Sequence, residues 1–210
     1  LVAMSPEQRK AATVVVASTA GARPPLPGEL DATHSLEPRR EIAPQSGGIG
    51  PPARGETFSN PIPIETFPFE DAKSVLGKYR EFVAKAPDDL TVWVVLRKAP
   101  PLPFLPTAWH GKEILAAAFC WSGDPAQAEK AIAPIKTWAT PVGEHIGTMP
   151  LAVWQTTLDP LLTPGARNYW KSHDYVSLDD ETIDAILAAV RKLPTGECET
   201  FIGHLGGAVN

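Results

Sequence analysis

The chain has 210 residues, a formal net charge of −5 and a pI near 5.5. This length suits one medium domain or one domain with a tail. No block of Lys or Arg offers phosphate groups a dense positive face, so we do not expect a nucleic acid partner. No segment approaches the roughly 20 apolar residues of a membrane-spanning helix. We therefore expect a soluble chain without a membrane partner.

Residues 1–57 differ in composition from the rest of the chain. They contain no Phe, Tyr or Trp, because every aromatic residue lies at or after Phe58. A segment without large apolar side chains cannot bury enough surface to offset the entropy lost on ordering. We predict a largely disordered N-terminal tail over 1–57 and a domain over 58–210. Within the tail, residues 11–17 could form a short strand if a sheet is present to pair with them.

The first predicted elements of the domain are a strand, a helix and a second strand. Residues 62–69 form a short apolar run interrupted by two prolines, which favours an edge strand. A helix then runs from Glu70 to near Pro87, because apolar residues recur there at helical spacing. Residues 90–96 are almost continuously apolar. This pattern predicts a strand that is buried on both faces or lies beside a ligand cavity.

The middle of the domain combines a loop, a strand and two helices. A proline-rich loop over 99–106 leads to a second central strand over 112–121. Asp124 and Pro125 supply an N-cap residue and a first-turn proline, so a helix begins there. A short helix is predicted over 149–158.

The last third predicts a strand over 168–176, a helix capped by Ser177 with Asp180, and a closing strand over 199–205. The order of elements predicts an α+β fold with a mostly antiparallel sheet and helices packed on one face. No later strand follows the closing one. We therefore expect its outer edge to be exposed and to promote association.

Cysteine, tryptophan and histidine residues indicate structural roles in this chain. Cys120 and Cys198 lie in apolar segments without a CxxC spacing, so we interpret them as buried thiols, with a disulfide as the alternative. Free thiols are compatible with a cytoplasmic location. His110 and His145 lack partners at metal-ligand spacing, and no metal site is predicted. Four tryptophans lie in apolar patterns and are predicted to be core residues: Trp93, Trp121, Trp138 and Trp154.

Several short motifs follow one another in an order known from one family of flavin enzymes. They are SVLGKYREF at 74–82, APPLPF at 99–104, CW at 120–121, PLAVWQTTLD at 150–159, NYWKS at 168–172 and HLGG at 204–207. Over about residues 60–210 the chain resembles the substrate-binding domain of FAD-linked oxidases of the berberine bridge enzyme-like group, within the vanillyl-alcohol oxidase superfamily.

The resemblance implies part of a FAD-dependent oxidoreductase that acts on a small-molecule substrate. In this family an N-terminal domain with glycine-rich turns holds FAD, and residues 47–50 match such a turn only faintly. The later strands, which carry the family's usual catalytic base, have no counterpart here. We therefore expect the chain to be truncated at both ends, to contain no catalytic or cofactor-binding residue, and to be inactive alone.

The family also suggests where substrate would bind, because its sheet forms a roof over the flavin. The strand over 168–176 places Tyr169 and Lys171 on one face and Trp170 on the other. We interpret Tyr169 and Lys171 as substrate-binding residues, since Trp170 is better suited to packing under helices. His204 is a third substrate-binding candidate because adjacent glycines permit close approach of a ligand. A solvated Lys171 and an ordinary half-buried His204 are the alternatives.

Two other hypotheses for the whole chain stay open. It could be a non-enzymatic product of a truncated or frameshifted gene, which the absence of aromatic residues before Phe58 favours. It could also be a binding subunit that needs a separate flavin-binding chain.

Overall fold

The computed structural model describes residues 12–18, 59–61, 64–145, 147–150, 169–175 and 177–204. Its main sheet contains the strands β1 (Ala12–Ser18), β3 (Ile64–Pro68), β4 (Leu90–Lys98), β5 (Glu113–Trp121), β6 (Gly143–His145), β8 (Tyr169–Tyr175) and β9 (Cys198–His204). The short strands β2 (Ser59–Pro61) and β7 (Thr148–Pro150) pair with each other. The helices are α1 (Ala72–Val83), α2 (Pro125–Ile132) and α4 (Asp180–Val190).

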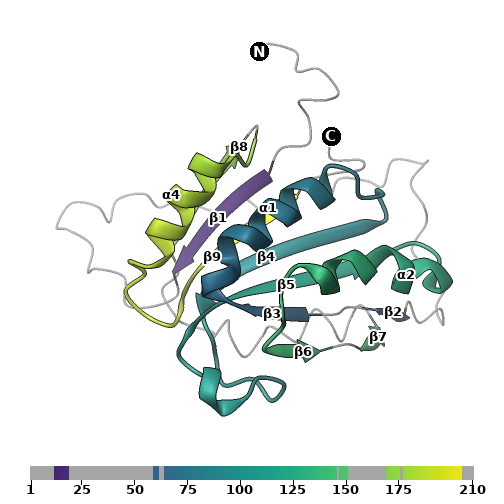
Figure 1. Ribbon diagram of the computed structural model, residues 1–210, viewed down its shortest axis with the longest axis horizontal. Coiled ribbons are helices and arrows are strands. Elements are labelled where there is room, and N and C mark those ends of the chain that lie inside the picture. The colour runs from purple at the N-terminus through teal and green to yellow at the C-terminus, as the bar shows by residue number, and fades with distance from the viewer. Residues whose placement is uncertain are drawn as a thin grey trace, which may run out of the picture.

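The seven strands lie in the order β6-β3-β5-β4-β9-β1-β8, and every pairing between them is antiparallel. Figure 1 shows α1, α2 and α4 on the same side of this sheet. The predicted α+β fold, a mostly antiparallel sheet with helices packed on one face, is thereby confirmed. Within the described part of the chain, each helix is too short or too polar to cross a membrane.

The neighbours of three strands differ from what the sequence alone suggested. β1 pairs with β9 on one side and with β8 on the other, so the sheet supplies the partner that this apolar run needed. β9 is therefore an inner strand, and the exposed edge predicted at Glu199 is wrong. β3 is also not an edge strand, because β6 pairs with its outer side. The other residues of the predicted tail lie outside the described residues.

Two of the three described α-helices, α2 and α4, begin where a short polar side chain binds a free backbone N–H group. Asp124 caps α2 by accepting a hydrogen bond from the N–H of Ala126 at 3.0 Å, as predicted. Asp179, and not Ser177 with Asp180, caps α4 by accepting from the N–H of Thr182 at 2.8 Å. This bond to the backbone lowers the pKa of the Asp179 carboxyl.

Two further helix predictions have mixed outcomes. The helix predicted from Glu70 is confirmed as a short 3-10 turn over Phe69–Asp71 followed by α1. The helix predicted over 149–158 begins instead as β7, and its residues 151–158 lie outside the described residues.

One hydrophobic core fills the space between the helices and the sheet. Trp138 lies near its centre, with its ring edge-on to those of Tyr79, Phe82 and Phe119 at centroid distances of 6.2, 5.6 and 6.4 Å. Buried side chains of α1 and α4, among them Val75, Leu76, Ile183 and Ile186, complete this cluster. The core is thus one-sided, with the sheet as its floor and the helices as its cover.

β4 shows this one-sidedness residue by residue. Val92, Val94 and Leu96 are buried, whereas Trp93 between them is 49% exposed. The expectation of burial on both faces is therefore wrong for this strand. Its sequence is almost continuously apolar because the face away from the helices also carries apolar side chains.

The two adjacent valines of β4 test the one-sided core. Val94→Ala should reduce the free energy of unfolding by about 2–3 kcal/mol, because it opens a cavity between sheet and helices. Val95→Ala removes the same atoms from the half-buried opposite face and should cost less than about 1 kcal/mol. Urea unfolding of both variants measures the difference. Equal losses would contradict the assignment of the two faces.

Candidate functional site

An exposed row of aromatic side chains lies on the face of the sheet opposite the helices, which we call the open face. Trp93 on β4 lies 6.1 Å from Phe201 on β9, and Phe201 lies 5.7 Å from Trp170 on β8, measured between ring centroids. Trp93 and Trp170 are 49% and 48% exposed. We call these three residues the aromatic row. Exposed aromatic surface that links three strands is typical of a binding surface.

The register of the strands explains why these three side chains meet. Phe201 alternates along β9 with the buried Thr200 and Ile202, so it points away from the helices. β4 presents Trp93 and Val95 on the same side, and Val95 is directly opposite Phe201. Pairing through β1 brings Trp170 to this side as well.

An ion pair borders the aromatic row on the open face. Arg97 is directly opposite Glu199 in the register of β4 and β9, and their side chains form an ion pair that is 11% and 15% exposed. Arg97 also donates to the carbonyl oxygen of Gly196 at 3.0 Å. Burial raises the pKa of the Glu199 carboxyl, and Arg97 opposes that shift. The pair therefore gives this end of the row a fixed polar border.

The three predicted substrate-binding residues lie elsewhere. Through β1, Lys171 is level with Thr200 and Tyr169 with Cys198, both of which belong to the helix-covered side of β9. Lys171 Nζ lies 5.8 Å from the centre of the Tyr169 ring, so these two side chains do meet. His204 is level with Tyr175 at the other end of the strands, so it is not brought together with Tyr169. Their role in binding stays a prediction.

The structural argument behind that prediction was wrong in one respect. Trp170 was expected to pack under helices, yet it lies on the open face beside Phe201. β8 is an edge strand, and on its helix side only Tyr175 is half-buried against the core. The apolar Trp170 finds its contact across the sheet instead.

The sequence suggested that four tryptophans are core residues, but not all of them are. Trp121 and Trp138 are buried as predicted, and Trp154 lies outside the described residues. Trp93 was also predicted to be core, and this was wrong. The signal that could have found it is its position in β4, since strict alternation puts it opposite to Val92 and Val94.

Neither metal nor thiol chemistry finds support in the described residues. No group of three or more potential metal ligands is present among them. Neither Cys120 nor Cys198 forms a disulfide, and burial raises the pKa of Cys120. A thiol with a raised pKa is a poor nucleophile at neutral pH.

A buried carboxylate, Glu65, lies on the helix side of β3 beside the exposed Glu144, where sequence analysis had predicted no site. Glu65 is only 2% exposed and is directly opposite Glu144 on β6. Lys136 Nζ forms an ion pair with Glu144 at 3.3 Å, while Oε2 of Glu65 has no hydrogen-bond partner among the described residues. Burial, together with the nearby Glu144 charge, raises the pKa of Glu65 to about 7.

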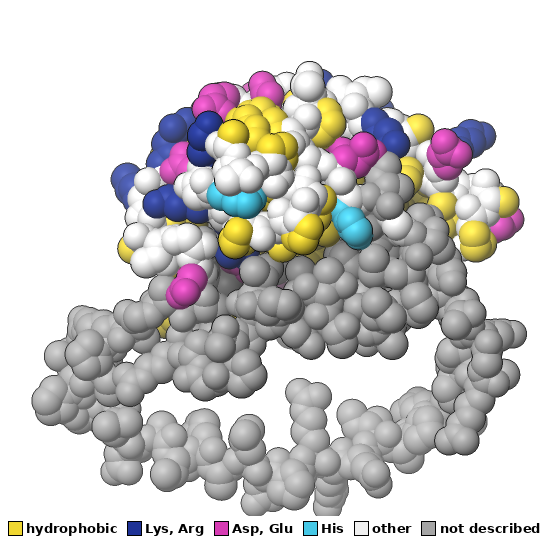
Figure 2. Space-filling view, turned by 90° about the horizontal axis from the view of Figure 1, so that it is seen from below, with side chains coloured by type: hydrophobic (Ala, Val, Ile, Leu, Met, Phe, Trp, Pro, Cys, Tyr) yellow, Lys and Arg dark blue, Asp and Glu magenta, His cyan; other side chains and the backbone are white. Residues whose placement is uncertain are grey.

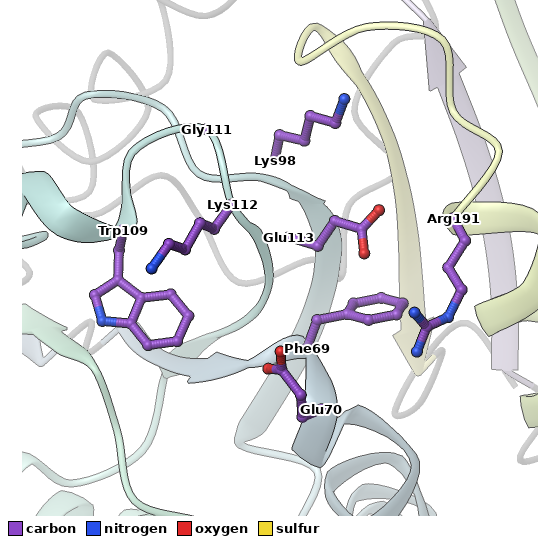
Figure 3. A pocket seen from close by; sticks show the side chains of 8 residues that line it. All are labelled: Phe69, Glu70, Lys98, Trp109, Gly111, Lys112, Glu113 and Arg191. Carbon is purple, nitrogen blue, oxygen red and sulfur yellow. The ribbon is translucent and has the colours of Figure 1, made fainter.

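A shallow pocket of about 510 Å³ lies at the end of the sheet where β3 and β4 end and β5 begins (Figure 3). The buried Phe69 and the half-buried Trp109 both line it. Five charged side chains surround them, namely Glu70, Lys98, Lys112, Glu113 and Arg191. Seen from below the view of Figure 1, basic and acidic side chains are mixed around hydrophobic ones (Figure 2).

The described helix starts do not resemble a phosphate site. α1, α2 and α4 begin after Asp71, Asp124 and Asp179, and a carboxylate at a helix N-terminus competes with a bound phosphate. The glycine-rich residues 47–50 lie outside the described residues. The described residues therefore offer a surface for a planar ring but no cradle for a pyrophosphate.

The Glu65 carboxyl should make stability depend on pH. Because folding raises its pKa from 4.5 to about 7, its proton stabilises the native state fully below about pH 4.5, and this contribution is lost as the pH rises through 7. Glu65→Gln should therefore be more stable than the parent chain at pH 8, by about 2–3 kcal/mol, and similar to it at pH 4.5. Urea unfolding at both pH values measures this. A Glu129→Gln control, on an exposed residue of α2, should show no such pH-dependent gain.

Comparison with known proteins does not assign the chain to a family. The chain matches no family model and no curated protein. The similarity to FAD-linked oxidases therefore depends on the motifs given above, and what it implies about function is developed as a proposal.

Proposed function

We propose that residues 58–210 form the substrate side of a FAD-dependent oxidoreductase, with the open face of the sheet covering the flavin ring and the substrate. The observation that carries this proposal is the aromatic row of Trp93, Phe201 and Trp170, exposed on the face without helices. A planar, uncharged ring system is a suitable partner for such a surface, because aromatic faces stack with a gain of dispersion energy and loss of water.

The residues of the open face would then position and shield the reacting groups. A bound flavin would supply the redox chemistry, which is the acceptance of a hydride from an alcohol, sugar or amine-type carbon. Trp93 and Trp170 would exclude water from the ring, which strengthens electrostatic interactions with the substrate. The Arg97–Glu199 pair would form a fixed polar border, because the two side chains are held by their ion pair and by the hydrogen bond from Arg97 to Gly196.

The remainder of the cofactor would be bound outside the described residues. Acidic residues at all three described helix starts argue against a pyrophosphate there. Another part of the protein, or a separate flavin-binding chain, would provide that site. Tyr169 and Lys171 would reach a substrate only around the edge of the sheet at β8, and they stay predictions.

A direct test uses FMN as a fluorescent probe of the open face. FMN emission should be quenched as the protein concentration rises, because a flavin ring stacked on tryptophan loses its fluorescence, and Trp93→Ala or Trp170→Ala should weaken binding roughly three- to tenfold through loss of stacking. Tyr169→Ala is the matched control, since it removes an aromatic side chain of similar exposure from the other side of β8. No quenching of FMN emission, or equal weakening by Tyr169→Ala, would contradict the proposal.

A second experiment separates a redox role from binding alone. If an adjacent reading frame encodes a glycine-rich flavin-binding chain, that chain and this one should form a complex. Under anaerobic conditions, addition of alcohols, sugars or amines to the complex should bleach the flavin absorption band for at least one of these classes. A complex whose flavin stays oxidised with all of them would favour the non-enzymatic binding subunit instead.

A further inference from the structure

We propose that the pocket at the end of the sheet binds a small zwitterion, whose carboxylate meets Arg191 and Lys98 and whose ammonium group meets Glu70 and Glu113. The pocket volume of about 510 Å³ suits a single small molecule rather than a macromolecule. It lies at the sheet end and not on the open face, so this site is separate from the proposed flavin surface.

Two cations of the pocket are held by aromatic rings rather than by acids. The guanidinium carbon of Arg191 lies 4.9 Å from the centre of the Phe69 ring, and Lys112 Nζ lies 5.0 Å from that of Trp109. Such cation–π contacts orient the charged group without neutralising it. In Figure 3 the Arg191 guanidinium lies beside the Phe69 ring, and the Glu113 carboxylate lies above that ring in this view.

The five charged side chains of the pocket form no ion pairs with one another in the described structure. Lys98 is directly opposite Glu113 in the register of β4 and β5. The ion pairs of the described residues nevertheless all lie elsewhere and involve none of the five charged side chains of the pocket. An incoming carboxylate would therefore gain the planar donor fork of Arg191 without displacing a protein acid.

A rigid loop fixes one wall of the pocket. The N–H of Ala99 donates to the carbonyl of Lys112 at 2.8 Å, and the N–H of Gly111 donates back to the carbonyl of Ala99 at 2.9 Å. Gly111 has a φ of 78°, a conformation that glycine adopts without strain, and this turn directs the chain into β5. A small apolar cluster that includes Leu105 and Ile114 supports the loop from behind. Preorganised walls reduce the entropy lost on binding.

The balance of charge selects a zwitterion over a simple ion. Three cations and two carboxylates surround the pocket, so a ligand with only a negative group would meet Glu70 and Glu113 without compensation. A ligand with only a positive group would meet the three cations. A molecule with both charges and an apolar body, such as an aromatic or aliphatic amino acid, meets both the cations and the carboxylates, while Lys112 stays over the Trp109 ring.

Three matched probes test this site: L-phenylalanine, 3-phenylpropionate, which lacks the ammonium group, and 2-phenylethylamine, which lacks the carboxylate. Titrations followed by amide and indole NMR shifts should show signals of Trp109 and Gly111 moving. L-Phenylalanine should bind roughly three- to tenfold more tightly than either analogue, as expected for partly exposed charge-assisted contacts.

Variants then assign the two charges. Arg191→Gln should weaken L-phenylalanine and 3-phenylpropionate but not 2-phenylethylamine, and Glu113→Gln should weaken L-phenylalanine and 2-phenylethylamine but not 3-phenylpropionate. Lys130→Gln, on an exposed residue of α2, is the control. If Arg191→Gln disturbs the end of α4, Lys98→Gln tests the same carboxylate contact. The proposal is overturned if neither analogue binds more weakly than L-phenylalanine, or if Lys130→Gln has the same effect. The FMN test on the open face is independent of this result.

Discussion

The alternation of side chains along β4 is the constraint on which the rest of the structure depends. This strand pairs with β5 on one side and β9 on the other, and its register decides which side chains of both neighbours face the helices. Val94 is level with Ala117 and Ile202, and all three are buried. A slip by one residue would exchange this covered set for the open one. The core and the aromatic row are therefore two results of one register.

In the described part of the chain the helices cover only one face of the sheet, so the apolar side chains of the other face meet either water or a partner. On the open face Arg97 and Glu199 form a mostly buried ion pair, and Trp93 and Trp170 leave apolar area in contact with water. The exposed area of these tryptophans brings no gain in folding free energy, and the proposed binding role would give it a physical reason. The same reasoning applies to Glu65, whose burial destabilises the native state at high pH.

Sequence analysis predicted the elements better than their surroundings. The strong helical period of α1 and the Asp-Pro start of α2 located those helices. Both signals depend only on residues that are close together in the sequence. Alternation in β8 correctly separated Tyr169 from Trp170, yet it could not say which side the helices cover. That answer depends on pairing through β1 with β9, two segments far apart in the sequence. The pair of Glu65 with Glu144 was missed for the same reason, since an isolated glutamate in an apolar run gives no sign of its partner.

The central claim is that the sheet has one covered face and one open aromatic face, and hydroxyl-radical footprinting read out by mass spectrometry tests it most directly. The account predicts fast oxidation of Trp93 and Trp170 and strong protection of Trp121 and Trp138, which are 5% and 4% exposed. All four are the same residue type, so intrinsic reactivity is matched. Protection of Trp93 equal to that of Trp121 would contradict the account.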